Sequence, residues 1–368
     1  MFLALKEMKK EKVRFIMIIL ITALIAYLVY FLSSLAFGLA QINRTTIDYW
    51  DAKGIVLTKS SNENIYASMI DRQFIVDSNL DIDNSINLAS ASVYVNSDEP
   101  INVAFVGYNI GQDNLVAPII EGRAIEDTFE TVVSKNLQSK ADVEIGDTIR
   151  MASVGRAFTV VGFTSDSNYN TLPAVYIDRE LASAEMMIYT SNNPEEDAVA
   201  TPTPNMPQRV SAVVVYDDVD QSKLDEYELD YIAIDDYING LPGYQAQVLT
   251  FGLMIAALAV ISSIITGIFM YILTMQKKSI FGVLKIQGYR NGYIMKSVIL
   301  QTILVTLLGA LTGLLLSILT IQFLPSTVPV AINWPLFIGV TVFSIVCSFI
   351  GTVFSARSIL KIEPLDAL

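Results

Sequence analysis

The sequence predicts a membrane protein in which one transmembrane helix precedes, and three follow, a large extracellular α+β domain. The first observation is the composition: 52% of the 368 residues are hydrophobic and 17% are charged, with a mean hydropathy of +0.48, which is too apolar for a purely soluble protein. The second is a set of long stretches without Asp, Glu, Lys or Arg, each able to cross a bilayer as a helix. The third is an acidic segment between the first two stretches, in which short β-rich runs alternate with polar turns.

The first uncharged stretch covers residues 15–43, between Arg14 and Arg44. It is long enough for one helix that crosses the bilayer. A secretory signal peptide has a shorter apolar region that ends near a small-residue cleavage site, so this stretch is expected to remain as a membrane anchor. Residues 1–14, which precede it, are predicted to form an amphipathic helix in the cytoplasm.

The other three spans lie in the C-terminal part of the chain. Residues 244–276 are predicted to form the second span, followed by a basic loop over residues 277–296. The last apolar stretch is too long for one helix and contains prolines, which break helices. It therefore predicts a hairpin of two spans, residues 297–324 and 334–356, followed by a tail over residues 357–368. The prolines are Pro325, Pro329 and Pro335.

The basic residues predict the orientation of these spans, because the cytoplasmic flanks of membrane helices are rich in Lys and Arg. The two terminal flanks and the 277–296 loop contain 12 of the 24 basic residues but only four of the 37 acidic ones. Both termini are therefore expected in the cytoplasm of a multi-pass protein of the cell membrane. The segment 44–243 then lies outside the cell with 12 basic and 33 acidic residues, a net charge of −21, which solubility is sufficient to explain.

The 44–243 segment is predicted to be an α+β domain of two lobes. Strands are expected where β-branched and apolar residues cluster between polar turns. These are residues 54–58, 102–108, 131–134, 148–153, 158–163 and 210–216, with helical patches at 63–74 and 135–143. Residues 191–208 are rich in Pro, Ser, Thr and Asn, and they predict a long exposed loop that is either a lobe boundary or a flexible insertion.

Residue types that several chemistries require are missing from the sequence. It has no histidine and a single cysteine, Cys347, which excludes a Cys/His zinc site, a His-based catalytic triad and an internal disulfide. The overall charge of −13 argues against a nucleic-acid partner. The sequence contains no P-loop motif, so ATP hydrolysis by that chemistry has to come from a partner. The chain is expected to have no catalytic and no metal-binding residues of its own.

The 277–296 loop carries apolar side chains that the orientation of the spans does not explain. Five apolar residues lie at helical spacing among the lysines: Ile280, Phe281, Val283, Leu284 and Ile286. An exposed apolar stripe of this kind fits a groove in a partner protein. The residues expected to contact that partner are Lys278, Ile280, Phe281, Leu284 and Lys285.

Several segments resemble the MacB-type, also called type VII, ABC transporter permeases. YILTMQKKSIFGVLKIQGYRNGYI, residues 271–294, resembles the segment that follows the second helix of these permeases. RSILKIEPLDAL, residues 357–368, resembles their closing Pro-x-x-Ala-Leu signature. The stretch from IIEGRAI at residue 119 to VYID at residue 178 is similar to the core of their outer domain. The matches span the chain in order, and they imply the same layout of one plus three helices around an outer domain.

Within that family, residues 1–15 and 39–68 look most like the heme-efflux permeases called HrtB and their DevC-like relatives. This resemblance implies a separate ABC ATPase subunit, HrtA-like, which binds ATP and Mg²⁺. Two copies of the chain would form a homodimer that pairs with two ATPase subunits. The long first and second helices would then act as levers and extrude heme by mechanotransmission. The resemblance implies no permanently bound cofactor, with heme as the substrate.

Heme is a flat apolar ring with two carboxylates, so a site for it needs an aromatic slot with a cation or amides nearby. The outer half of the first span and the start of the second supply such side chains. The candidates are Tyr30, Phe31, Phe37 and Gln41 on the first span, then Arg44 at the membrane surface, with Tyr244 and Phe251 opposite on the second span. Aromatic residues at membrane interfaces also form belts, so a purely structural explanation stands beside this one.

Small residues occur four apart in three of the predicted spans. The pairs are Ser34 and Gly38, Ser263 and Gly267, and Gly309 and Gly313. Such pairs let two helices approach closely, either within one chain or between two copies of it. The sequence favours neither arrangement.

Two further functions are compatible with the same fold and the same ATPase partner. The first is export of another amphiphile or of a peptide. The second is mechanical activation of an extracellular enzyme, as in permeases of the FtsX type. A cell-wall hydrolase bound to the extracellular domain would favour the second function, whereas a bilayer-soluble cargo would favour export through these uncharged spans.

Overall fold

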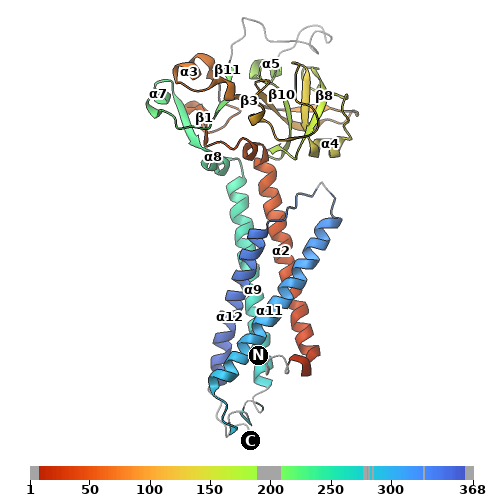
Figure 1. Ribbon diagram of the computed structural model, residues 1–368, viewed down its shortest axis with the longest axis vertical. Helices are drawn as coiled ribbons and strands as arrows, with labels where there is room; N and C mark the ends of the chain where they lie inside the picture. Colours follow the sequence, from red (N-terminus) through yellow and green to blue (C-terminus); the bar gives the residue numbers. More distant parts are fainter. Residues whose placement is uncertain are drawn as a thin grey trace. The chain divides into compact units, whose positions relative to one another are not determined.

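The chain forms two compact units in the computed structural model, which describes residues 8–188, 209–276, 280, 282–283, 286–325 and 328–360 (Figure 1). The membrane unit comprises Met1–Leu39 and Gln247–Leu368, and the inserted domain comprises Ala40–Ala246. The loop expected at residues 191–208 and the last eight residues of the predicted tail lie outside the described residues.

Four helices of the described chain are long and apolar enough to cross a membrane, the first of them near the N-terminus. They are α2 (Lys12–Tyr49), α9 (Tyr244–Gln276), α11 (Asn291–Phe323) and α12 (Trp334–Leu360). α2 continues beyond the predicted end at residue 43, and α11 begins before the predicted start at residue 297. Pro335 lies in the first turn of α12, where its missing N–H group leaves no helical hydrogen bond unmade.

Small residues bring α2 and α11 into close contact within the membrane unit. A Cβ atom added at Gly313 would lie 2.6 Å from the backbone nitrogen of Tyr27 and 2.7 Å from the backbone oxygen of Ala23. One added at Gly309 would lie 2.7 Å from the side chain of Thr22. Since real Cβ atoms do not approach other atoms this closely, the crossing depends on glycine at both positions.

The other two small-residue pairs also pack against the same chain. A Cβ atom at Gly38 would lie 2.2 Å from the carbonyl oxygen of Pro329, and the carbonyl oxygen of Ser34 accepts a 3.2 Å hydrogen bond from Ala331. A Cβ atom at Gly267 of α9 would lie 3.8 Å from Gly351 of α12. Packing within one chain therefore accounts for all three pairs.

The inserted domain is an α+β fold, which confirms the predicted fold class. Its main sheet has the strand order β13-β1-β12-β3-β4-β10-β6-β8-β5 and also includes β7 and β9, while β2 pairs with β11. The strands are β1 (Gly54–Thr58), β2 (Ile70–Asp71), β3 (Ser85–Tyr94), β4 (Ile101–Tyr108), β5 (Ile119–Gly122), β6 (Glu130–Ser134), β7 (Thr148–Met151), β8 (Ala157–Thr164), β9 (Asn168–Tyr169), β10 (Leu172–Asp178), β11 (Arg209–Val210), β12 (Ala212–Val215) and β13 (Leu229–Ala233). The helices are α3 (Arg72–Asp77), α4 (Lys135–Ala141), α5 (Ala184–Ile188), α7 (Gln221–Glu226) and α8 (Ile234–Gly240).

Six strands of the main sheet close into a ring. The pairing runs β3-β4-β10-β6-β8-β7 and returns to β3, because β7 pairs with both β8 and β3. Successive side chains of a strand point to opposite faces. In β4, Val103 and Phe105 belong to one buried cluster, whereas Ala104 and Val106 belong to another. Both faces of β4 are buried over most of its length, which explains why it reads as an apolar run in the sequence.

The cluster that contains Ala104 and Val106 also includes the end of α2. Ile47 and Trp50, each 1% exposed, come from or directly follow that helix, and the same cluster holds residues of β1, β10, β12 and α8. This cluster therefore includes residues from both ends of the main sheet, and two further buried clusters of the domain are separate from it. The end of α2 is part of this core rather than a linker that leads to it.

The helix predicted over residues 63–74 is wrong. Asn62 and Glu63 have φ angles of 51° and 63°, which a right-handed helix does not contain. Helix α3 begins only at Arg72, because the Asp71 carboxylate caps it by accepting a 3.0 Å hydrogen bond from the N–H group of Gln73. The predicted helix at residues 135–143 is confirmed as α4.

Candidate functional site

Apolar side chains are exposed in the loop that follows α9. Ile280, Val283 and Ile286 have helical backbone and are 47%, 49% and 58% exposed. Residues three apart on a helix are neighbours, so these three form one apolar surface, here called the loop surface. The other predicted contact residues, Lys278, Phe281, Leu284 and Lys285, lie outside the described residues.

Two tyrosines that were not among the predicted site residues lie next to the loop surface in the chain. Gly288, with a φ angle of 88°, ends the helical stretch, and α11 begins at Asn291. Tyr289 and Tyr293 are both exposed, and their ring centroids lie 5.4 Å apart. In the sequence, two tyrosines four residues apart at the start of a helix could have indicated this aromatic surface. They provide further aromatic surface for a protein partner.

The side chain of Tyr30 packs against the fourth span and does not face the second span. Its hydroxyl is 2.6 Å from Oγ1 of Thr341, and its ring packs edge-on against Phe337 at 5.2 Å between centroids. Both partners belong to α12, and Tyr30 is buried. Tyr30 is thus a buried aromatic ring whose hydroxyl has a partner, and its predicted role in cargo binding stays a prediction.

The remaining aromatic candidates of the membrane unit are half-buried. Phe31 stacks on Tyr27 of its own helix at 6.0 Å between centroids. Phe37 on α2 and Phe251 on α9 are also half-buried. These three rings keep enough exposed surface to contact an apolar molecule.

The candidate cargo-binding residues of the inserted domain form a small polar group at the end of α2. The Arg44 guanidinium forms an ion pair with Asp48 one turn along the helix, with nitrogen to oxygen distances of 2.5 to 3.0 Å. Its Nη1 also donates to the hydroxyl of Tyr244 at 3.4 Å. Gln41 is half-buried one turn before Arg44. Arg44 and Tyr244 thus lie in contact, and the charge of Arg44 is paired with that of Asp48.

A groove that the sequence did not predict lies between α9 and α12. Its volume is about 490 Å³. Gly267 and Gly351, which lie close together, line the groove, and Tyr271 supplies a polar group. The lining residues are Val260, Ser263, Ile264, Gly267, Ile268, Tyr271, Cys347, Ile350 and Gly351. Apart from the Tyr271 hydroxyl and the small groups of Ser263 and Cys347, this surface suits an apolar molecule.

Comparisons with known proteins find a family match for the C-terminal part of the chain. Residues 252–364, which include the groove and the loop surface, match the family described as FtsX-like permease C-terminal. The chain is 25% identical over its whole length to the "Putative hemin transport system permease protein HrtB" of Staphylococcus epidermidis, with 99% of that protein covered. The protein of the same name from Staphylococcus haemolyticus is 22% identical, again over the whole chain and 99% of the relative.

Solved structures show a more distant likeness. The periplasmic region of MacB from Actinobacillus actinomycetemcomitans is 13% identical over 50% of this chain and 88% of that one, with a TM-score of 0.34. The extracellular domain of the noncanonical ABC-type transporter YknZ from Gram-positive bacteria is 14% identical over 49% of this chain and 98% of that one, with a TM-score of 0.32.

Proposed function

We propose that the chain is an FtsX-like permease, with the MacB-type layout of one helix before and three helices after an inserted domain, and that it exports heme from the membrane. In this proposal it is a non-catalytic subunit that works as a homodimer with a separate, HrtA-like ATPase. The family implies an ABC ATPase partner. The single observation that supports heme as the cargo is the similarity to HrtB-named permeases over the full length of the chain. ATP and Mg²⁺ are assigned to the partner, and heme is assigned as substrate rather than cofactor.

The loop surface is the proposed contact with the ATPase. Three half-exposed aliphatic side chains at helical spacing are costly to leave in water and favourable to bury in a groove of another protein. Replacing Val283 and Ile286 by Asp should therefore abolish binding of the ATPase, because two carboxylates would have to be desolvated in an apolar groove. The measurement is copurification of the ATPase from cells that express both chains.

The control for that prediction places the same two charges on polar positions of the same loop. Gln287 and Asn291 are exposed, and Gln287→Asp with Asn291→Asp should leave copurification unchanged. Equal loss of the ATPase in both double variants would show that charge, and not the loop surface, controls assembly.

The basic flanks support a cytoplasmic location for both termini and an extracellular location for the inserted domain. A cysteine introduced at the exposed position Glu99 should react with a membrane-impermeant maleimide on intact cells, in a Cys347→Ser background. A cysteine at Gln287 should react only after the cells are permeabilised. The opposite labelling pattern would show that the proposed topology is inverted, and it would refute the proposed export mechanism.

The proposed cargo-binding residues of α2 are Phe37, Gln41 and Arg44. These residues are four and three apart, so they share one side of the helix. A half-buried ring, an amide and a cation in a row suit an apolar molecule with a carboxylate at one end. Because Arg44 is paired with Asp48, a carboxylate of the bound molecule has to compete with the Asp48 carboxylate for the Arg44 guanidinium.

Heme titration of the purified permease–ATPase complex, followed by absorbance, tests the cargo. Phe37→Ala should weaken heme binding about tenfold, since a Phe side chain contributes roughly 1.5–3 kcal/mol when buried. Asp48→Asn should strengthen binding, because it frees Arg44 for a propionate. Phe349→Ala, which removes an exposed ring from α12, serves as the matched control and should have no effect. A wild-type complex that does not bind heme would refute the cargo and favour another amphiphile, a peptide or an extracellular enzyme partner.

A further inference from the structure

One stretch of β3 in the inserted domain has an open edge, although the strand is paired at both ends of that stretch. β12 pairs with this edge at Ser85 and Ile86, and β7 pairs with it again from Val93. Within the described residues, no strand pairs with the same edge between those positions. At about 3.3 Å per residue, the open stretch from Leu88 to Ser92 is about 13 Å long.

The backbone groups that point to this open edge can be assigned from their neighbours. The N–H and C=O groups of successive strand residues point to alternate edges, so every second residue faces the same way. The N–H group of Leu88 donates to Oγ of Ser211 at 3.2 Å, and the carbonyl oxygen of Ser92 accepts from the N–H group of Ala152 at 2.8 Å. Ser90 lies midway between them. Its N–H and C=O groups therefore point to the open edge, where no described strand pairs with them.

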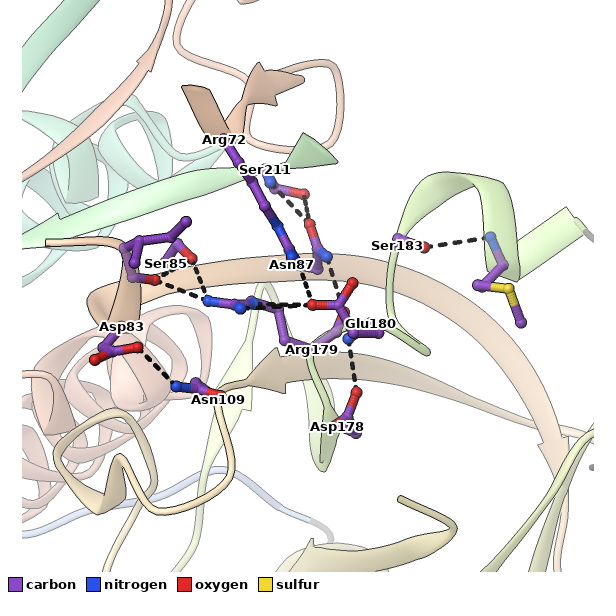
Figure 2. Close-up of polar contacts among 12 residues, drawn as sticks. Arg72, Asp83, Ser85, Asn87, Asn109, Asp178, Arg179, Glu180, Ser183 and Ser211 are labelled. Atoms are coloured by element: carbon purple, nitrogen blue, oxygen red, sulfur yellow. Dashed lines mark hydrogen bonds and ion pairs between the residues drawn. The ribbon is translucent and has the colours of Figure 1, made fainter. Parts of the chain in front are cut away.

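A buried asparagine fixes the place where β12 leaves β3. Oδ1 of Asn87 accepts a 2.9 Å hydrogen bond from the N–H group of Ser211, the residue before β12, and its Nδ2 donates to the carbonyl oxygen of Arg179 at 2.8 Å (Figure 2). Nη1 of Arg179 in turn donates to Oγ of Ser85 at 2.6 Å. Asn87 is 2% exposed, so breaking its hydrogen bonds would leave buried polar groups without partners. These side chains hold β12 where it is and leave the edge beyond it open.

The side chains along the open stretch are small. Residues 89–92 read Ala-Ser-Ala-Ser, whereas strands usually carry β-branched and aromatic residues. Ser90 is exposed, and Ala89, Ala91 and Ser92 are half-buried. Side chains of this size leave the backbone of the edge accessible to a second backbone.

The open edge lies in a groove with a volume of about 250 Å³. Leu88 and Ser90 line one side of it. Tyr66 and Met69, which precede β2, and Arg209 of β11 supply further lining. A groove that combines free backbone groups with apolar side chains suits an extended peptide, because the main-chain bonds give affinity and the side-chain contacts give specificity.

Arg209 gives the groove a positive charge. Its side chain is exposed, and its Nη1 atom lies 3.9 Å from Sδ of Met69. Asp71 is the cross-strand neighbour of Arg209, but its carboxylate accepts a hydrogen bond from the N–H group of Gln73. Among the described residues, no carboxylate lies within ion-pair distance of Arg209. In a segment, residues 44–243, with a net charge of −21, such a cation favours an acidic group on a bound molecule.

We propose that this groove binds an extended segment of a partner protein, which adds to the open edge of β3 as a short strand and places an acidic side chain near Arg209. The free groups repeat at every second residue, from the C=O of Leu88 to the N–H and C=O of Ser90, which is the spacing of a strand and not of a compact small molecule. The partner lies on the same side of the membrane as the inserted domain. This surface goes beyond heme export, because it involves neither the cargo nor the ATPase.

Peptide selection on the full-length chain in lipid nanodiscs tests the proposal. The probe is a phage-displayed library of random octapeptides, from which selected peptides are synthesised with a fluorescent label and titrated by fluorescence polarisation. The selected peptides should contain β-branched residues and at least one Asp or Glu. Amide hydrogen exchange resolved to single residues should show fast exchange at Ser90 in the free chain and slower exchange when a peptide is bound.

Two variants of one residue separate the backbone from the side chain. Ser90→Pro removes the N–H group from the open edge and should weaken peptide binding about tenfold or more, since a strand hydrogen bond is lost and the proline ring obstructs the edge. Ser90→Ala keeps the N–H group and should bind within about twofold of the wild type. Proline is tolerated where the N–H group is unpaired, and a thermal unfolding midpoint close to that of the wild type confirms that the variant is folded.

A charge reversal provides a second test that leaves the backbone unchanged. Arg209→Glu should weaken binding of the acidic peptides about fivefold, because attraction at the groove becomes repulsion. Lys140→Glu is the matched control: Lys140 is exposed on α4 and does not line the groove, so the affinity should not change.

Three outcomes would overturn the proposal. The first is equal peptide binding by the wild type and Ser90→Pro, which would place the peptides elsewhere. The second is the selection of no peptide by the wild type but of several by a chain in which a Gly-Ser linker replaces residues 191–208, which would make the protein's own segment the occupant. The third is the absence of binding by either chain. None of these results affects heme titration or copurification of the ATPase, so the groove and the proposed export function are tested separately.

Discussion

Replacing Gly313 by Leu is expected to destroy the packing of the membrane unit. A Cβ atom at this position would lie 2.6 Å from a backbone nitrogen and 2.7 Å from a backbone oxygen of α2. Neither atom can rotate away as a flexible side chain can, so the two helices have to separate. Overpacking of a core typically costs 1–3 kcal/mol of stability. Because the clash here is with the backbone, Gly313→Leu should destabilise the packing by roughly 3 kcal/mol or more.

The matched control is Gly339→Leu on α12. A Cβ atom there has no neighbour within 4 Å, so this substitution should change stability by no more than about 0.5 kcal/mol. Pulse proteolysis of the two variants in the same detergent measures the difference directly. Similar protection of both variants would show that α2 and α11 do not cross at Gly313.

Replacing Trp50 by Ala is expected to unfold the inserted domain at the junction with α2. Trp50 is 1% exposed and belongs to the cluster shared by α2, β1, α8 and the outer face of the strand ring. Deleting a buried Trp side chain costs roughly 3–5 kcal/mol, because both the burial and the packing around the cavity are lost. This is a large part of the stability of a single domain. Urea unfolding of the purified chain measures the loss of stability. Circular dichroism serves as the readout because it does not depend on tryptophan.

Trp50→Phe provides the comparison that separates packing from hydrogen bonding. Within the described residues, the indole Nε1–H of Trp50 has no hydrogen-bond partner. Phenylalanine removes this buried donor and keeps most of the ring, so the loss should be about 1–2 kcal/mol, well below that of alanine. Equal losses for Phe and Ala would indicate an unrecognised role for the indole nitrogen.

The membrane layout could be predicted from the sequence because it depends on local composition. A bilayer-spanning helix satisfies its own backbone hydrogen bonds, so its existence depends on length and hydrophobicity and not on distant residues. The break between the last two spans was likewise visible, because proline interrupts a helix by its own covalent structure. Strands with both faces buried, such as β4 and β8, were visible as unbroken apolar runs.

The boundaries at special backbone positions could not be predicted in the same way. Residues 63–74 have a helical composition, but positive φ angles at Asn62 and Glu63 and the cap at Asp71 delay the helix to Arg72. The hairpin at Asn170 and Thr171 was not predicted either, since Thr is a poor residue for a positive φ. Hydrogen bonds to Ile42 and Asn43, far away in the sequence, hold it in place.

The sequence by itself determined which segments are membrane helices, where the α+β domain is inserted and which apolar loop is exposed. Only the tertiary structure decided what each side chain faces. The sequence did not show that Tyr30 packs against Phe337 and Thr341 of the last helix, or that Asp48 pairs with Arg44. The physical reason is that hydrophobicity and helix formation act locally along the chain, whereas burial, pairing and the close approach at Gly313 depend on residues brought together from distant parts of the sequence.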